Sequence, residues 1–470
     1  MKSSIYSLVA LFIILFSATQ AQDTTNTLSV DMFFTLVRKY HPLAKQIELL
    51  DDKGTSVVLK EKGAFDPYLY SSLNQKYFDE KQYYHLLGTA LKIPTWYGVD
   101  FKLGYDQSAG QYLNAEDKLP SVGLAYAGVS LPLLQGLLIN ERRNVVKQAQ
   151  VFKQSTVVEQ KALLNDLMFD ALAAYWEWYA CYAQNIVYKD AAELSQQRFK
   201  GVRQSFLQGD RSAIDTLEAF LQYQNRLSNL NQSAIILQNA SYKLSNFLWS
   251  ANEEPLEITS ALIPAIDKKI FIDLSNEVDS LNVNVENLAA NHPQVLLYDY
   301  KYKSANIDLK WKLEKYKPKL NLNYNVLTAP VGNTIVSNLS TNNYKWGVDF
   351  SFPLFLRRER GDVKLSEIKL LEIEYAKQQK LLEQVNKIKM YRNELLVLQQ
   401  QRILFASMVS NYSSLLNAEK RNFESGESSL FLINAREMAL IDSQLKQIEV
   451  DAKLAKAYAG FQWGSAILVK

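Results

Sequence analysis

The sequence predicts an exported α+β protein built from two copies of one unit, in which a segment of β-strands precedes a very long helical hairpin. Three observations carry this prediction. The N-terminus resembles a secretory signal, an ordered set of landmarks occurs twice, and the hydrophobic period changes within each copy from that of a strand to that of a helix. Glycine and proline are scarce, at 17 and 11 residues in 470, which favours long elements over many short ones.

The first residues are typical of a secretory signal peptide. Lys2 precedes an apolar run over 5–16, and the small residues Thr19 and Ala21 occupy the −3 and −1 positions of a cleavage site. We therefore expect a signal peptide over 1–21. The alternative is a membrane anchor, but neither this run nor any other stretch reaches the roughly 18 apolar residues that a membrane helix needs. No cysteine lies near the cleavage site, so we expect no N-terminal lipid.

Composition excludes several classes of protein. The formal net charge is only +3, which gives no reason to expect nucleic acid. The one cysteine, Cys181, lies in an aromatic-rich helical stretch and is expected to be a small buried apolar side chain. Of the three histidines, His41 and His292 both precede proline, and a helix junction explains each. No metal-binding or phosphate-binding motif occurs, so we expect no enzyme, no catalytic residue, no metal and no cofactor.

Four landmarks occur twice in the same order. They are His41-Pro42 and His292-Pro293, Pro67 and Pro318, Ser130-Leu131-Pro132-Leu133 and Ser351-Phe352-Pro353-Leu354, and Phe206-Leu207-Gln208-Gly209 and Phe423-Glu424-Ser425-Gly426. An ordered set of this kind indicates duplication of one structural unit. The first copy has about 30 more residues between its two prolines than the second, which indicates an insertion there.

The landmarks divide the mature chain into a first repeat over 22–250, a joining segment over 251–285 and a second repeat over 286–470. Each repeat is expected to contain the same succession of elements. These are a helix (30–62 and 286–316), a β segment (66–131 and 318–353), a long helix (138–205 and 357–422), a tip (206–212 and 423–429) and a returning helix (213–250 and 430–460). A helix of about 65 residues spans roughly 100 Å, which is too long for the core of a globular domain.

The β segments alternate between apolar and polar residues. Examples are Leu320, Leu322, Tyr324 and Val326 against Asn321, Asn323 and Asn325, and the run from Tyr97 to Tyr105. Such strands suit a barrel with lipid outside and water inside, although a half-exposed soluble sheet has the same pattern. The signal peptide and the aromatic residues favour the barrel. The insertion, with Tyr83–Ile93 and Tyr97–Tyr105, forms an added hairpin or an excursion; four strands per protomer is the preferred arrangement over six.

The helices carry apolar residues at alternating steps of three and four. Two examples of such seams are Leu227, Leu230, Ala234, Leu237, Ser241, Leu244 and Leu248, and Ile441, Leu445, Ile448, Ala452, Ala455 and Ala459. These seams predict helices that pack side by side as in a coiled coil. The alanines of the second seam permit a close approach of neighbouring helices.

This duplicated order of helix, proline-flanked strands, long helix, glycine tip and returning helix resembles the TolC-like family of outer-membrane efflux proteins. The resemblance covers essentially the whole mature chain. It implies a homotrimer in the bacterial outer membrane, with a transmembrane β-barrel continued through the periplasm by a coiled-coil α-barrel. It also implies a periplasmic adaptor, or membrane fusion protein, and an inner-membrane transporter as partners. The chain would then be a passive duct of an efflux or type I secretion system.

The resemblance places contacts with the adaptor at the two tips. The residues concerned are Gly209, Asp210, Arg211, Ser212 and Asp215 in the first repeat, and Gly426, Glu427, Ser428 and Ser429 in the second. Ser212 is suited to capping the returning helix, and Asp215 to its first turn, where an acidic side chain favours the helix dipole. That structural role is an alternative to partner binding for Asp215.

The second tip departs from the family pattern, because Leu432 stands where some relatives have an aspartate that rings the periplasmic entrance. We therefore expect a periplasmic gate that depends on apolar contacts of Leu430, Phe431 or Leu432, with Glu427 nearby. The rival interpretation of the whole chain is a secreted periplasmic coiled-coil scaffold without a barrel. Drugs, metal ions and polypeptides all remain open as cargo.

Overall fold

The fold is taken from a computed structural model, which describes residues 27–258, 262–265, 271, 284–330 and 342–469. The predicted signal peptide and part of the joining segment lie outside these residues. The chain divides into two compact units. Unit 1 comprises residues 1–45, 164–285 and 386–470, and unit 2 comprises residues 46–163 and 286–385. The boundary between the units falls within α4 (Glu141–Leu207) and α9 (Arg357–Glu424).

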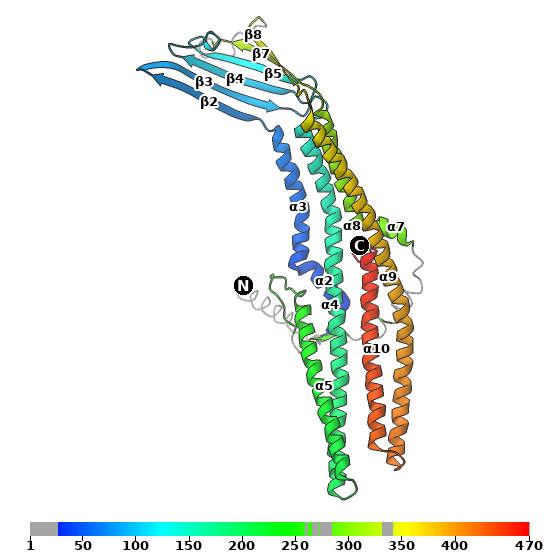
Figure 1. The fold of residues 1–470 in the computed structure, drawn as a ribbon. Helices are drawn as coiled ribbons and strands as arrows, with labels where there is room; N and C mark the ends of the chain where they lie inside the picture. Colours follow the sequence, from blue (N-terminus) through cyan, green and yellow to red (C-terminus); the bar gives the residue numbers. More distant parts are fainter. Residues whose placement is uncertain (1–26, 259–261, 266–270, 272–283, 331–341, 470) are drawn as a thin grey trace, which may run out of the picture. The chain divides into compact units, whose positions relative to one another are not determined.

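Unit 2 contains one six-stranded sheet in the order β2-β3-β4-β5-β7-β8, with every neighbouring pair antiparallel (Figure 1). The strands are β2 (Tyr68–Phe78), β3 (Lys81–Pro94), β4 (Asp100–Ala109), β5 (Leu124–Pro132), β7 (Lys319–Thr328) and β8 (Tyr344–Ser351). Helices α3 (Pro42–Lys62) and α8 (Pro293–Glu314) lead into β2 and β7, and α4 and α9 follow β5 and β8. Most strands have the 9 to 11 residues typical of a tilted membrane strand.

The preference for four strands is wrong, because the inserted residues add strands to the sheet. Residues 81–109 form β3 and β4, which extend the sheet between β2 and β5. The predicted strand from Tyr97 also begins too early, since Thr95–Val99 is a turn. Gly98 has φ of +89°, and the Thr95 amide donates to the Val99 carbonyl at 3.1 Å. Apolar and polar residues continue to alternate through this turn, so the sequence pattern did not reveal it.

Strand register places apolar side chains on one face of the sheet and polar side chains on the other, because directly paired residues point to the same side. One row crosses all six strands and is wholly apolar: Leu69, Leu91, Leu103, Ala127, Val326 and Tyr344. The adjacent row on the opposite face contains Lys92, Lys102, Gly128, Asn325 and Lys345. The sheet is therefore two-sided throughout its width.

Proline interrupts both helices that were expected to be continuous. In place of 30–62 the structure has α2 (Val30–Tyr40) and α3, and in place of 286–316 it has α7 (Val285–Ala290) and α8. His41 and His292 adopt nearly identical extended conformations, with φ and ψ of −64° and 132° and of −65° and 133°. Proline drives the residue before it out of the helical region. The predicted role of both histidines at helix junctions is confirmed.

Unit 1 contains the largest buried apolar cluster, which joins α2, α4, α5 (Ala213–Ser245) and α10 (Leu430–Gly464). Phe33 and Tyr175 stack at 5.5 Å, and the Tyr175 hydroxyl donates to the Leu28 carbonyl at 2.8 Å. Leu28 belongs to a short parallel pair of strands, β1 (Thr27–Leu28) and β6 (Ile263–Pro264). Cys181 is buried in this cluster, as predicted, and burial raises the pKa of its thiol.

Small residues of α10 allow neighbouring helices of unit 1 to approach it closely. Ala452, Ala455 and Ala459 are buried, the first two in the cluster with α2 and α4, and a side chain on Gly460 would collide with the ring of Tyr391 of α9. Trp463, one turn further on, stacks on Phe169 of α4 with ring centroids 4.5 Å apart. This close approach is what the alanine seam in the sequence predicted.

Among the described residues, no helix is both long enough and apolar enough to cross a bilayer.

Candidate functional site at the helical hairpin tips

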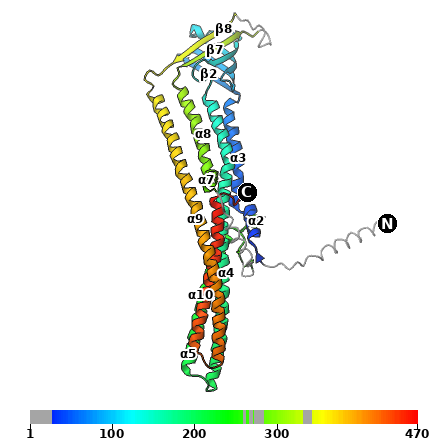
Figure 2. The ribbon, with the colours of Figure 1, turned by 90° about the vertical axis from the view of Figure 1, so that its right-hand side faces the viewer.

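The predicted site residues lie at two turns of unit 1 (Figure 2). Helix α4 ends at Leu207 and α5 begins at Ala213, while α9 ends at Glu424 and α10 begins at Leu430. Each turn therefore joins two helices that run back along one another. The tip residues named from the sequence all lie in these turns or in the first turn of the helix that follows.

Both long helices end in the same C-terminal cap. Gly209 and Gly426 have φ of +83° and +79°, a region that other L-residues enter only with strain. The Gly209 amide donates to the Phe206 carbonyl at 3.0 Å, and the Gly426 amide to the Phe423 carbonyl at 3.1 Å. In addition, the amide after each glycine reaches back five residues, as in a Schellman motif. Asp210 and Glu427 thus contribute their backbone amides to the caps.

The returning helices begin differently. Ser212 caps α5 as predicted, because its hydroxyl accepts from the Asp215 amide and the Asp215 carboxylate accepts from the Ser212 amide, both at 3.2 Å. Ser429 occupies the same place in α10 and accepts from the Leu432 amide at 3.4 Å. Leu432 has no carboxylate to complete this capping box. The structural role proposed for Asp215 is therefore present at the first tip and has no counterpart at the second.

An apolar cluster joins the two hairpins just behind the tips. Val202, Ala219 and Leu430 are buried there, with Phe199 and Phe423 packed against them. Leu430 is only 4% exposed, whereas Phe431 and Leu432 are 69% and 38% exposed. Of the three residues expected to form an apolar gate, Leu430 therefore packs inside the protomer, and only Phe431 and Leu432 lie at its surface.

Two polar contacts hold the remaining tip residues. The guanidinium of Arg211 lies over the ring of Phe423, 4.8 Å from its centroid, so that a residue of the first tip touches the helix of the second. The Ser428 hydroxyl donates to the Glu419 carboxylate, which Arg436 also approaches at 3.5 Å. Both contacts limit the movement of these tip side chains. Neither contact involves the outermost residues of the tips.

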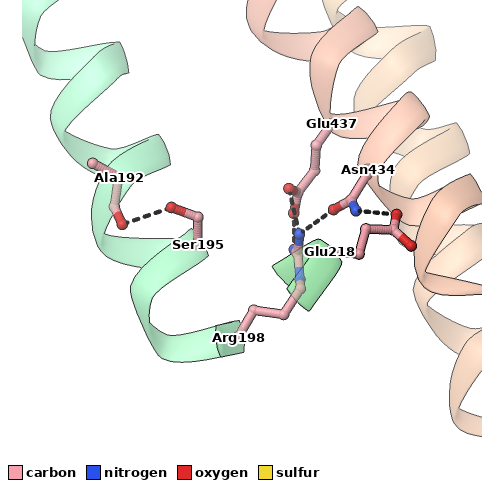
Figure 3. A network of polar contacts seen from close by, with 6 residues as sticks. All are labelled: Ala192, Ser195, Arg198, Glu218, Asn434 and Glu437. Carbon is pink, nitrogen blue, oxygen red and sulfur yellow. Dashed lines mark hydrogen bonds and ion pairs between the residues drawn. The ribbon is translucent and has the colours of Figure 1, made fainter. Parts of the chain in front are cut away.

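A buried polar network connects α4, α5 and α10 behind the apolar cluster (Figure 3). Arg198 forms a two-pronged ion pair with Glu437, and its Nη1 donates at 2.8 Å to one carboxylate oxygen. The same nitrogen donates to Asn434 Oδ1 at 2.9 Å, and Asn434 Nδ2 donates to Glu218 Oε1 at 3.2 Å. The guanidinium thus fixes α4 against α10, because a planar fork requires its acceptors in a fixed geometry, and Asn434 extends the network to α5.

A second buried cation lies near the same carboxylate. Arg226 of α5 is 9% exposed. Its burial lowers the pKa of the guanidinium, while the carboxylates of Glu437 and Asp442 oppose that shift. The positive charge of Arg198 adds to the burial effect. Glu437 therefore balances more than one positive charge inside the hairpin pair.

A groove of about 350 Å³ runs beside the network on the tip side. Its apolar floor includes Val202, Leu430 and Ile433, and its rim carries Arg211 and Lys420. Within the described residues, no group of three or more His, Cys, Asp or Glu side chains is arranged to hold a metal ion.

Sequence reasoning missed Arg198, Asn434 and Glu437, although one signal was present. Ala192, Ser195 and Val202 are buried on one stripe of α4, and Arg198 falls on that stripe at helical spacing. A charge on an otherwise buried stripe requires a buried partner, because an unpaired charge there is costly. The partner's position on α10 was not apparent from the sequence.

No protein-family model and no curated protein matches the chain by sequence. Solved structures match it closely in fold. The CmeC outer membrane channel of Campylobacter jejuni matches with a TM-score of 0.65 and 10% identity, over 93% of this chain and 85% of that one. The outer membrane protein VceC of Vibrio cholerae matches with 0.66 and 11%, over 93% and 95%. The open state of the Neisseria gonorrhoeae MtrE outer membrane channel matches with 0.65 and 10%, over 93% and 88%.

The glycine of the first tip and a glycine within α4 provide a matched test of the cap. We expect Gly209→Ala to destabilise the first tip by about 1 kcal/mol, because alanine is strained at positive φ. Gly201→Ala, within α4 and with open space around it, should stabilise the helix by about 0.5–1 kcal/mol. Amide hydrogen exchange over residues 198–220 measures both changes. Equal effects of the two substitutions would contradict the cap.

The buried ion pair is testable by a double-mutant cycle. Side chains of Arg198 and Glu437 are 16% and 8% exposed, so removing either leaves a charge buried. We expect Arg198→Met and Glu437→Leu each to cost about 3–5 kcal/mol of unfolding free energy, and the double substitution to cost much less. Denaturant unfolding of the solubilised protein measures this. Two small and additive losses would show that the pair is solvated.

Proposed function

This chain has the fold of TolC-like outer-membrane channels, and we propose that it forms the outer-membrane duct of a tripartite efflux or type I secretion system. The observation that carries the proposal is the two-sided sheet. An apolar row that continues across six strands, with lysines and asparagines on the other face, matches a wall between lipid and water. The rival candidate, a soluble periplasmic scaffold, does not require so wide an apolar face.

The sheet supports assembly as a homotrimer. Strands β2 and β8 are its edges in the described residues, and open edges cannot be left unpaired in lipid. Because the sheet has six antiparallel strands, β8 of one copy runs antiparallel to β2 of the next, and a ring closes with uniform pairing. Three copies give an 18-stranded barrel, which is about 1.5 times as wide as a 12-stranded one, since diameter grows roughly linearly with strand number.

The hairpin tips are the proposed contact with a periplasmic adaptor, which in turn joins an inner-membrane transporter. The groove between the hairpins, with an apolar floor and the cations Arg211 and Lys420 at its rim, suits an amphipathic helical segment with acidic residues. The exposed tip residues Asp210 and Glu427 extend this surface. Transport through such a duct is passive, and the transporter selects the cargo.

We propose that closure of the periplasmic end depends on Phe431 and Leu432, with Glu427 nearby. Both apolar side chains are exposed in the protomer, and neither has a role in its core. Around a threefold axis they would exclude water by mutual contact. A ring of carboxylates at the place of Leu432 is not available to this chain.

Bilayer experiments test the duct itself. We expect the purified protein to form heat-modifiable oligomers on gels and water-filled channels in planar bilayers. Leu322→Lys, on the apolar face of β7, should cost about 2–4 kcal/mol of membrane folding energy. It should therefore reduce both the amount of oligomer on gels and the number of channels in bilayers. Asn323→Lys, its neighbour on the polar face, should be tolerated. A water-soluble monomer without pore activity, or equal effects of the two lysines, would overturn the proposal.

The gate is tested by closed-state leak. We expect Phe431→Ser with Leu432→Ser to raise the resting conductance of the channel, because polar side chains admit water at the constriction. Ile235→Ser, an equally exposed apolar position on α5 far from the tip, is the control. An unchanged resting conductance would exclude an apolar gate at these residues.

A further inference from the structure

The loop between β4 and β5, residues 110–123, is held against the sheet at several points. The Gln111 and Tyr112 amides donate to the Gln82 and Tyr83 carbonyls at 3.1 and 3.0 Å, and the rings of Tyr83 and Tyr112 lie 4.7 Å apart. Further along, the Leu119 amide donates to the Ser108 hydroxyl at 3.2 Å. The loop, which includes the short helix η2 (Ala115–Asp117), is therefore a fixed part of the sheet's end.

This loop covers the polar face of the sheet. A hollow of about 460 Å³ separates them, and loop residues Glu116, Asp117 and Leu119 line it together with Lys102 and Lys345 of the strands. Register places both lysines in the polar row that crosses β3 to β8. The other charged loop residue, Lys118, is exposed and does not line the hollow.

The two sides of the hollow differ in charge. The loop contributes two carboxylates, whereas the sheet contributes two ammonium groups and the carboxylate of Asp106, so the loop side is the more negative of the two and the field is directed from wall to loop. In the proposed barrel, the polar face lines the lumen, and the loop lies inside the passage. Three copies would place three such loops in an 18-stranded lumen, where a wall without them would leave a wide aqueous hole.

We infer that the β4–β5 loop is a resident constriction of the lumen, and that Glu116 and Asp117 give it a preference for cations. This inference rests on the proposed duct. It goes beyond it, because it assigns conductance and charge selectivity to named residues of the β4–β5 loop in unit 2.

Single-channel recording of the full-length protein in planar bilayers tests the inference. We expect replacement of residues 112–120 by Gly-Ser-Gly to raise conductance about twofold or more, because the open cross-section grows. Glu116→Gln with Asp117→Asn retains the loop, so we expect similar conductance but a reversal potential shifted away from cations in a KCl gradient. Asp79→Asn with Glu80→Gln is the matched control, since this acidic pair occupies the β2–β3 turn at the same end of the sheet.

A labelling experiment keeps the test independent of the shortened loop's folding. Asp117→Cys introduces an accessible thiol, whereas the native cysteine, Cys181, is buried. We expect a cationic thiol reagent to reduce the current of Asp117→Cys, because it places a positive charge where the carboxylate stood, and to leave the unsubstituted channel unchanged. Channels whose conductance, reversal potential and thiol response are all unaffected would overturn the constriction and leave the duct standing. Failure of the unsubstituted protein to form channels would instead overturn the proposed duct.

Discussion

The unpaired backbone groups at the edges of β2 and β8 are the constraint on which the proposed assembly depends. A sheet that is apolar across six strands is stable in lipid only when its edge N–H and C=O groups find partners. One protomer is too narrow to provide them by curling on itself. The proposed trimer and its lumen follow from this one requirement. In the proposed trimer, the helices that follow β5 and β8 would be held in a ring by the strands they continue.

The hairpin tips meet a different requirement, which is to hold α4, α5 and α10 in one register where little apolar surface is available. Arg198 and Glu437 do so at an energetic cost, since both charges leave water. An apolar pair of similar volume would pack as well but would tolerate sliding of one helix along another. The forked guanidinium, bonded to α10 at both Asn434 and Glu437, permits one alignment. We attribute the pair to specificity of packing in the tips.

The regions that follow a local sequence pattern were predictable. The regions whose structure depends on contacts with distant segments of the chain were not. The strand alternation, the long helices and the capping by Ser212 follow from local rules that the residues obey. The breaks at Pro42 and Pro293 also follow from a local rule, but helical periodicity on both sides obscured them. The two added strands and the Arg198 network depend on which segments pair in space. Their local sequence is compatible with a loop and with a solvated face, respectively.

The inserted segment adds two strands, β3 and β4, and this number has a consequence for how such a wall can change in evolution. Insertion of a single strand would make the outer strands of neighbouring copies run in the same direction and would displace the following helix to the opposite end of the sheet. A whole hairpin preserves both the direction of the chain and the antiparallel seam. Channels of this architecture are therefore expected to differ in girth by discrete increments of six strands per trimer.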